Sequence, residues 1–146
     1  MNKDLVPYQP SIDIKELGFD EPCFVYWVYD GVEITYSTSH NKSGWSIIGF
    51  KNSQMLKKAG LCTSPTFSQA FRWFREKHNL MFQIFYLRNG NYAVLIHRTT
   101  PEYMDLIDQV NPSSGCVDEV VDCYSYEEAE LECLLKLIEI VKQQKQ

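Results

Sequence analysis

The chain has 146 residues, of which 45% are hydrophobic and 14% aromatic, and it carries a net charge of −5. This length suits a single domain with an apolar core, and the composition excludes an intrinsically disordered chain. Residues 1–80 carry nine basic and eight acidic side chains, whereas residues 81–146 carry five and eleven. The acidic C-terminal part disfavours contact with phosphate backbones there.

The N-terminus predicts neither a secretion signal nor a membrane anchor. The first ten residues are polar, carry Lys3 and Asp4, and lack the apolar region of a signal peptide. No stretch of the chain approaches the roughly 18 apolar residues of a membrane span. We therefore expect a soluble protein in the cytoplasm of the host cell.

The first 60 residues predict an arm, a short helix and a hairpin. Residues 1–10 contain two prolines and are expected to form a loose arm. Residues 11–18 predict a short helix with Ser11 as its cap and Gly18 at its end. A β-hairpin is then expected over 23–36, because two β-rich runs flank Asp30 and Gly31. The rest of this N-terminal hairpin region, 11–60, favours a strand over 45–50 and helical turns over 52–60.

Residues 64–146 predict a unit with the order αβββα. Ser64 and Pro65 are typical of a helix start, and the helix is expected to end near residue 79. Its apolar stripe consists of Phe67, Ala70, Phe71 and Phe74. Two further segments, 80–87 and 92–97, flank Asn89 and Gly90 and predict a second hairpin, whose loop leaves room for a bulge. A short helix over 102–110 and a strand over 116–124 follow.

The last helix is the clearest local pattern in the chain. Ser125 and Glu128 match a capping box, in which each side chain binds a free backbone N–H. One apolar stripe runs through Leu131, Leu134, Leu135, Ile138 and Val141, and a second through Cys133, Leu137 and Ile140. The whole pattern predicts an α+β fold over residues 1–146 as a single domain. Its helices should cover one face of one antiparallel sheet.

Three segments resemble a known group of proteins. They are KELGFDEPCF over residues 15–24, SPTFSQAFRWFREKH over 64–78 and YSYEEAELECLLKLI over 124–138. Together they resemble uncharacterised small accessory proteins of Bacteroidota phages and prophages, across most of the chain. The resemblance implies an accessory protein that binds components of the phage or of its bacterial host. It supplies no catalytic residue.

A second resemblance concerns topology alone. The order αβββα is that of double-stranded-RNA-binding domains, which place basic side chains at the start of the last helix. Here that position carries Glu127, Glu128 and Glu130. We therefore do not expect RNA binding through this helix.

The sequence predicts neither catalysis nor a metal or cofactor site. Phosphate-binding, zinc-protease and serine-hydrolase motifs are all absent. Cys116 with His97 is conceivable as a thiol and its base, but nothing in their spacing brings them together. The histidines His40, His78 and His97 are scattered, and so are the cysteines Cys23, Cys62, Cys116, Cys123 and Cys133. An odd cysteine count without close spacing favours reduced core residues.

Three surfaces remain candidates for binding a partner. The first consists of apolar side chains outside the main helix stripes, which belong either to a well-buried helix or to an interface with a host or phage protein or a second copy of the chain: Trp73, Cys133, Leu137 and Ile140. The second is a basic group that fits nucleic acid or a nucleotide: Lys51, Lys57, Lys58, Arg72, Arg75 and Lys77. The third is an acidic stretch that is either solvated or complementary to a basic partner: Asp105, Asp108, Asp118, Glu119 and Asp122.

Overall fold

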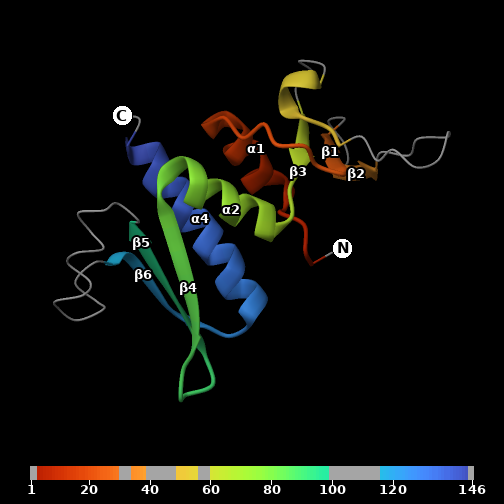
Figure 1. Cartoon of the computed structure of the whole chain (residues 1–146). Helices are drawn as coiled ribbons and strands as arrows, with labels where there is room; N and C mark the ends of the chain where they lie inside the picture. Colours follow the sequence, from red (N-terminus) through yellow and green to blue (C-terminus); the bar gives the residue numbers. More distant parts are fainter. Residues whose placement is uncertain (1–2, 30–33, 39–48, 56–59, 99–115, 145–146) are drawn as a thin grey trace. The chain divides into compact units, whose positions relative to one another are not determined.

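The computed structural model describes residues 3–29, 34–38, 49–55, 60–98 and 116–144 (Figure 1). The backbone contacts divide the chain into two compact units, 1–70 and 71–146. Helices and antiparallel strands occur in both, so the predicted α+β class is confirmed. The strands form two three-stranded sheets, however, and not the one sheet that the sequence predicted. The prediction of a single domain stays a prediction.

Unit 1–70 contains one helix packed on a small sheet. Helix α1 (Tyr8–Leu17) is followed by the strands β1 (Val25–Tyr29), β2 (Ile34–Thr38) and β3 (Leu61–Ser64). A short 3-10 helix, η1 (Asn52–Gln54), precedes β3. The strand order is β2-β1-β3, so the predicted hairpin is present. Strand β3 forms the edge of this sheet opposite β2, and it lies against α1.

The N-terminal segment is held in place, and the prediction of a loose arm over 1–10 is wrong for its described part. Val6 is buried, and its N–H donates to the carbonyl of Pro65 at 2.9 Å. Its carbonyl accepts three buried hydrogen bonds, from Ser11 Oγ at 3.1 Å, Trp27 Nε1 at 3.0 Å and Ser64 Oγ at 3.1 Å. Because its partners come from three other parts of the sequence, local composition could not reveal this anchor.

Helix α1 starts three residues earlier than predicted. Its N-cap is Pro7, whose carbonyl accepts from the N–H of Ser11 at 3.0 Å. The hydroxyl of Ser11 binds Val6 instead of capping the helix. The predicted end is confirmed, since Gly18 has a φ of 106° and adopts the left-handed conformation of a helix C-cap.

Helix α2 (Phe67–His78) begins two residues after the predicted start. Ser64 belongs to β3, and the cap is Thr66, whose Oγ1 accepts from the N–H of Gln69 at 3.2 Å. Gln69 Oε1 accepts from the N–H of Thr66 at 3.1 Å in return, which completes a capping box. The helix ends before Asn79, whose φ of 54° turns the chain.

Unit 71–146 contains the second half of α2, a sheet and the last helix. The strands are β4 (Leu80–Tyr86), β5 (Tyr92–Arg98) and β6 (Cys116–Cys123), in the order β4-β5-β6. All neighbours are antiparallel. The second hairpin and the order αβββα are therefore confirmed. The predicted bulge is found between β5 and β6 rather than in the hairpin of β4 and β5.

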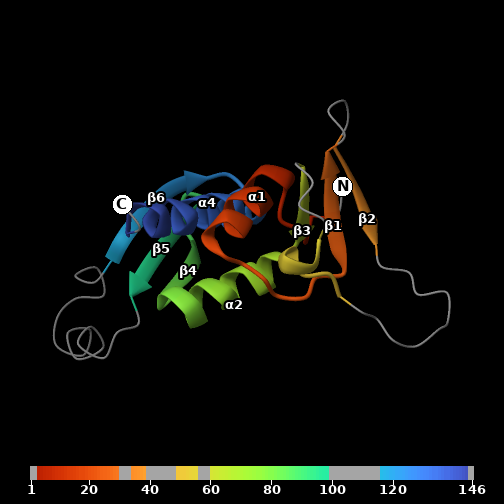
Figure 2. The same cartoon turned by 90° about the horizontal axis from the view of Figure 1, so that it is seen from above.

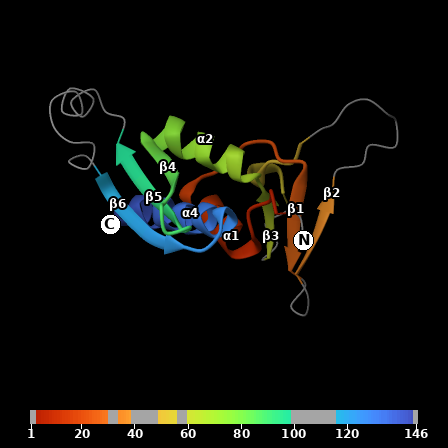
Figure 3. The same cartoon turned by 90° about the horizontal axis from the view of Figure 1, so that it is seen from below.

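Helix α4 (Tyr126–Gln144) lies against this sheet (Figures 2 and 3). Its capping box is confirmed: the N–H of Glu128 donates to Ser125 Oγ at 3.1 Å. The Glu128 carboxylate accepts from the N–H of Tyr124 at 2.7 Å. The predicted helix 102–110, the residues 45–48 of a predicted strand and the residues 56–59 of predicted helical turns lie outside the described residues.

The two faces of β4 differ in exposure. Leu80, Phe82 and Ile84 are buried or half-buried, whereas Met81, Gln83 and Phe85 between them are exposed. This alternation is that of a strand with one covered face. The covered face lies toward α4, which contacts all three strands. The other face of β4 carries apolar side chains in solvent.

Candidate functional site

The predicted apolar interface is not a surface of the chain. Trp73, Cys133 and Ile140 are buried, and Leu137 is 1% exposed. The ring of Trp73 packs edge-on against His78, with centroids 4.7 Å apart. These side chains are therefore core residues, and the second apolar stripe of α4 is fully buried, whereas Leu135 of the first stripe is exposed. Because the sequence shows only that a stripe is apolar, it could not distinguish a helix buried on two sides from one with a free side.

The predicted basic group is only partly brought together. Arg72, Arg75 and Lys77 are exposed on α2 in unit 71–146. Lys51 is half-buried beside η1 in unit 1–70. The remaining two residues of the group, Lys57 and Lys58, lie outside the described part of the chain.

The buried thiols are poor nucleophiles. Burial raises the pKa of Cys23 to about 11 and that of Cys62 to about 12, and it raises the pKa of Cys133 as well. These thiols therefore stay protonated near neutral pH, whereas nucleophilic catalysis needs a thiolate.

Cys116 and His97 are partners in the register of β5 and β6, a proximity that their sequence spacing did not reveal. Burial lowers the pKa of His97, which favours the neutral ring. His97 Nε2 lies 3.4 Å from Gln83 Oε1, and its Nδ1 is buried without a partner among the described residues. The side chain of Cys116 lies outside the described part of the structure, so the register is all that brings the pair together.

The acidic stretch lies largely beyond the described structure. Asp105 and Asp108 fall outside the described residues. Asp118, Glu119 and Asp122 lie in strand β6, where the structure describes the backbone but not these three side chains. Among the described side chains, no group of three histidines, cysteines or carboxylates could hold a metal ion. No described helix is long and apolar enough to cross a membrane.

Strand β4 carries three of the exposed large hydrophobic side chains that the structure describes in unit 71–146. Met81 is 41% exposed, Phe85 42% and Tyr86 70%, and these three residues are called the β4 surface below. All seven residues of the strand, Leu-Met-Phe-Gln-Ile-Phe-Tyr, are uncharged. The strand order places β4 at an edge of its sheet, and its only described pairing is with β5. Edge strands of soluble proteins usually carry charges or prolines that prevent further pairing.

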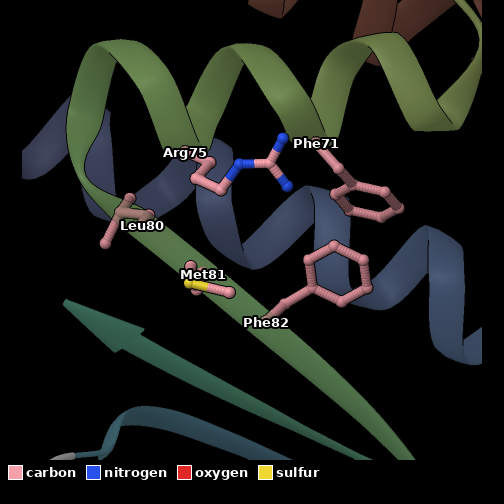
Figure 4. A pocket seen from close by; sticks show the side chains of 5 residues that line it. All are labelled: Phe71, Arg75, Leu80, Met81 and Phe82. Carbon is pink, nitrogen blue, oxygen red and sulfur yellow. The ribbon is translucent and has the colours of Figure 1, made fainter. Parts of the chain in front are cut away.

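A cavity of about 240 Å³ lies between α2 and β4 (Figure 4). It is lined by Phe71, Arg75, Leu80, Met81 and Phe82, and these five residues are called the edge groove below. Figure 4 shows Phe71 above Phe82, and Arg75 above Met81 with its guanidinium pointing toward Phe71. The rings of Phe71 and Phe82 lie 4.0 Å apart between centroids, at 31° to each other. The groove thus combines four apolar side chains with one cation.

The sequence predicted 80–87 as a hairpin strand and Arg75 as part of a basic group, and it did not predict that they line one groove. An apolar strand of this kind is equally typical of the centre of a sheet. The strand order, which the sequence does not contain, makes β4 an edge. Comparison of the chain with protein-family models, with curated proteins and with solved structures finds no match.

Proposed function

We propose that the chain is a non-enzymatic protein-binding module and that strand β4 provides its binding surface. The observation that carries this proposal is the exposure of Met81, Phe85 and Tyr86 on an uncharged edge strand. Met81 and Phe85 share one face of the strand, and neighbouring exposed apolar side chains mark interaction sites more often than isolated ones do. Full burial of one such side chain stabilises a complex by about 1.5–3 kcal/mol, so a partner that covers β4 gains a substantial free energy.

Two further observations support a binding role over a catalytic one. The thiols of Cys23, Cys62 and Cys133 have raised pKa values, and the edge groove contains no carboxylate, histidine or thiol. Its one charged side chain is Arg75, and a guanidinium suits recognition better than proton transfer.

The partner class follows from the resemblance to phage and prophage accessory proteins, so the proposed partner is a protein of the phage or its bacterial host. A second copy of the chain is the other protein that could cover β4, and the resulting homodimer would be isologous. Both partners place the interface on β4 and not on α4.

Site-specific photocrosslinking in Bacteroidota cells tests this proposal. A photoreactive phenylalanine analogue at Phe85 should give a discrete adduct under ultraviolet light. The matched control is the same analogue at Leu135, which is 38% exposed on α4. An adduct of twice the mass of the chain identifies the homodimer, and any other discrete mass identifies a different partner. No adduct at Phe85, or equal adducts at both positions, would contradict the proposal.

Nucleic-acid binding is the second candidate, because three exposed cations lie along α2: Arg72, Arg75 and Lys77. Their number is small, and binding through phosphate contacts is strongest at low salt. Fluorescence anisotropy with labelled single- and double-stranded oligonucleotides at two salt concentrations decides this candidate. An absence of binding at low salt excludes it.

A further inference from the structure

We propose that the edge groove binds an extended peptide segment, which adds to β4 as a fourth strand of the sheet. The segment places an apolar side chain against Phe71 and Phe82 and a carboxylate beside Arg75. This inference rests on the proposed protein-binding function and specifies the chemistry of the partner. Strand addition of this kind combines backbone hydrogen bonds, which give affinity, with side-chain pockets, which give specificity.

The first element is the free backbone of β4. Just after the strand, the N–H of Leu87 donates to the carbonyl of Asn91 at 2.8 Å, so these two residues form a hydrogen-bonded pair. The register continues without a shift, and hydrogen-bonded pairs alternate with non-hydrogen-bonded pairs, so Phe85 with Ala93 is again a hydrogen-bonded pair. Phe82 and Ile84 belong to the non-hydrogen-bonded pairs, and their backbone N–H and C=O groups therefore point away from β5. The open edge therefore offers N–H and C=O groups in the spacing that an extended segment requires.

The second element is the position of the aromatic pair in the groove. Residues that lie opposite each other in a sheet point to the same face. A residue that pairs with Phe82 therefore points to the covered side of β4, where Phe71 and Phe82 line the cavity. The cavity volume of about 240 Å³ accommodates an aliphatic side chain such as leucine, whose contacts there remove apolar surface from water.

The third element is Arg75, which lines the groove from helix α2. Its side chain is exposed, lines the cavity, and has no described ion pair or hydrogen bond. Figure 4 shows its guanidinium above Met81 and pointing toward Phe71, so it faces the space beside Phe82. Since residues i and i+2 of a strand share a face, the segment needs a carboxylate two positions from its apolar residue. The guanidinium matches a carboxylate in charge and geometry. The recognised pattern is an apolar residue and Glu or Asp separated by one residue.

Peptide binding to the full chain tests the inference. The probes are labelled ten-residue peptides with central Leu-Thr-Glu or Glu-Thr-Leu, because the two orders correspond to the two strand directions. We expect one order to bind, and Arg75→Gln to weaken it about tenfold, as for loss of a charged hydrogen bond. The matched control is Lys77→Gln, which removes the same charge from the same helix outside the groove and should change binding less than twofold. Thermal unfolding checks that both variants fold.

Backbone methylation of the bound peptide separates strand addition from other modes. One methyl group on an amide that faces β4 should abolish binding, and a methyl group on the adjacent amide should leave it unchanged, because successive N–H groups point to opposite sides. Tolerance of both methyl groups, loss with both, or insensitivity to Arg75→Gln would overturn the inference.

The remaining outcomes are equally decisive. If neither peptide binds while the analogue at Phe85 still crosslinks a protein, the peptide inference fails and the protein-binding function stands. If an oligonucleotide binds and Arg75→Gln weakens it while peptides do not bind, the groove is a phosphate site. If a stable homodimer covers β4 and peptide does not displace it, the occupant is a second copy.

Discussion

Removal of the donors around the Val6 carbonyl should destabilise the protein in a strongly non-additive way. Three buried donors meet at this one oxygen, namely Ser11 Oγ, Trp27 Nε1 and Ser64 Oγ, at 3.0–3.1 Å. A carbonyl oxygen has two lone pairs, so the three donors share two acceptor sites. Loss of one donor therefore leaves the oxygen satisfied.

The magnitudes follow from this geometry. A buried hydrogen bond contributes about 0.5–1.5 kcal/mol, and Ser11→Ala or Ser64→Ala alone should lie near the lower value. In a chain of this length, 1 kcal/mol corresponds to about 2–4 °C in Tm. The triple variant with Trp27→Phe leaves a buried carbonyl without a described side-chain donor, which costs about 1–3 kcal/mol more. Its loss of stability should thus exceed the sum of the single losses.

Urea unfolding followed by far-UV circular dichroism measures this effect without depending on the fluorescence of Trp27. The matched control is Ser68→Ala at an exposed position of α2, which should leave the free energy of unfolding nearly unchanged. Strict additivity of the three substitutions would refute the shared-acceptor reasoning. Deletion of residues 1–7 without any loss of stability would refute the anchoring of the N-terminal segment.

Three other predictions test separate parts of the fold. Ser125→Ala removes the cap of α4 and should cost about 1 kcal/mol in urea unfolding, whereas Ser125→Asp, which can still cap, should cost less. Gly60→Ala should lower Tm more than Gly18→Ala, although both glycines have a positive φ. A Cβ at Gly60 would lie 2.6 Å from the carbonyl oxygen of Tyr29, whereas a Cβ at Gly18 would meet nothing within 4 Å. Equal effects of the two substitutions on Tm would contradict this prediction. Burial lowers the pKa of His97 in the folded state, so the neutral His97 ring contributes to stability above pH 6.5. This contribution decreases as the pH falls through the pKa of the folded state. An NMR titration that gives His97 a pKa above 6.5 would refute this prediction.

Local signals predicted the elements whose partners are close in sequence. The capping box of Ser125 and Glu128 lies within four residues, and the hairpin of β4 and β5 is closed by Asn89 and Gly90. Both follow from the identity of neighbouring residues, and both are present.

Long-range competition explains the elements that were wrong. Ser64 and Thr66 are both suitable helix caps, and the sequence alone favoured Ser64 beside a proline. In the structure the Ser64 hydroxyl binds Val6, 58 residues away, and Gln69 completes the box with Thr66. The anchored N-terminal segment and the short strand β3 depend on the same distant contacts.

The candidate site could not be predicted because its decisive property is topological. The residues of β4 show their apolar character in the sequence, but their place at the edge depends on which strands pair. Arg75 appeared among the basic residues as a contact for nucleic acid. Its position beside Phe71 and Phe82 makes recognition of a carboxylate the alternative that the groove favours.

The uncharged edge strand also favours fibril formation by the purified protein. Seven residues with high β propensity, without proline or charge, can stack in register with copies of themselves and form cross-β fibrils. A bound segment on β4 would block this stacking, so a partner would also act as a protector against amyloid growth. Protein kept at high concentration without that partner should seed thioflavin-positive fibres from β4, and a lysine in place of Gln83 should delay them.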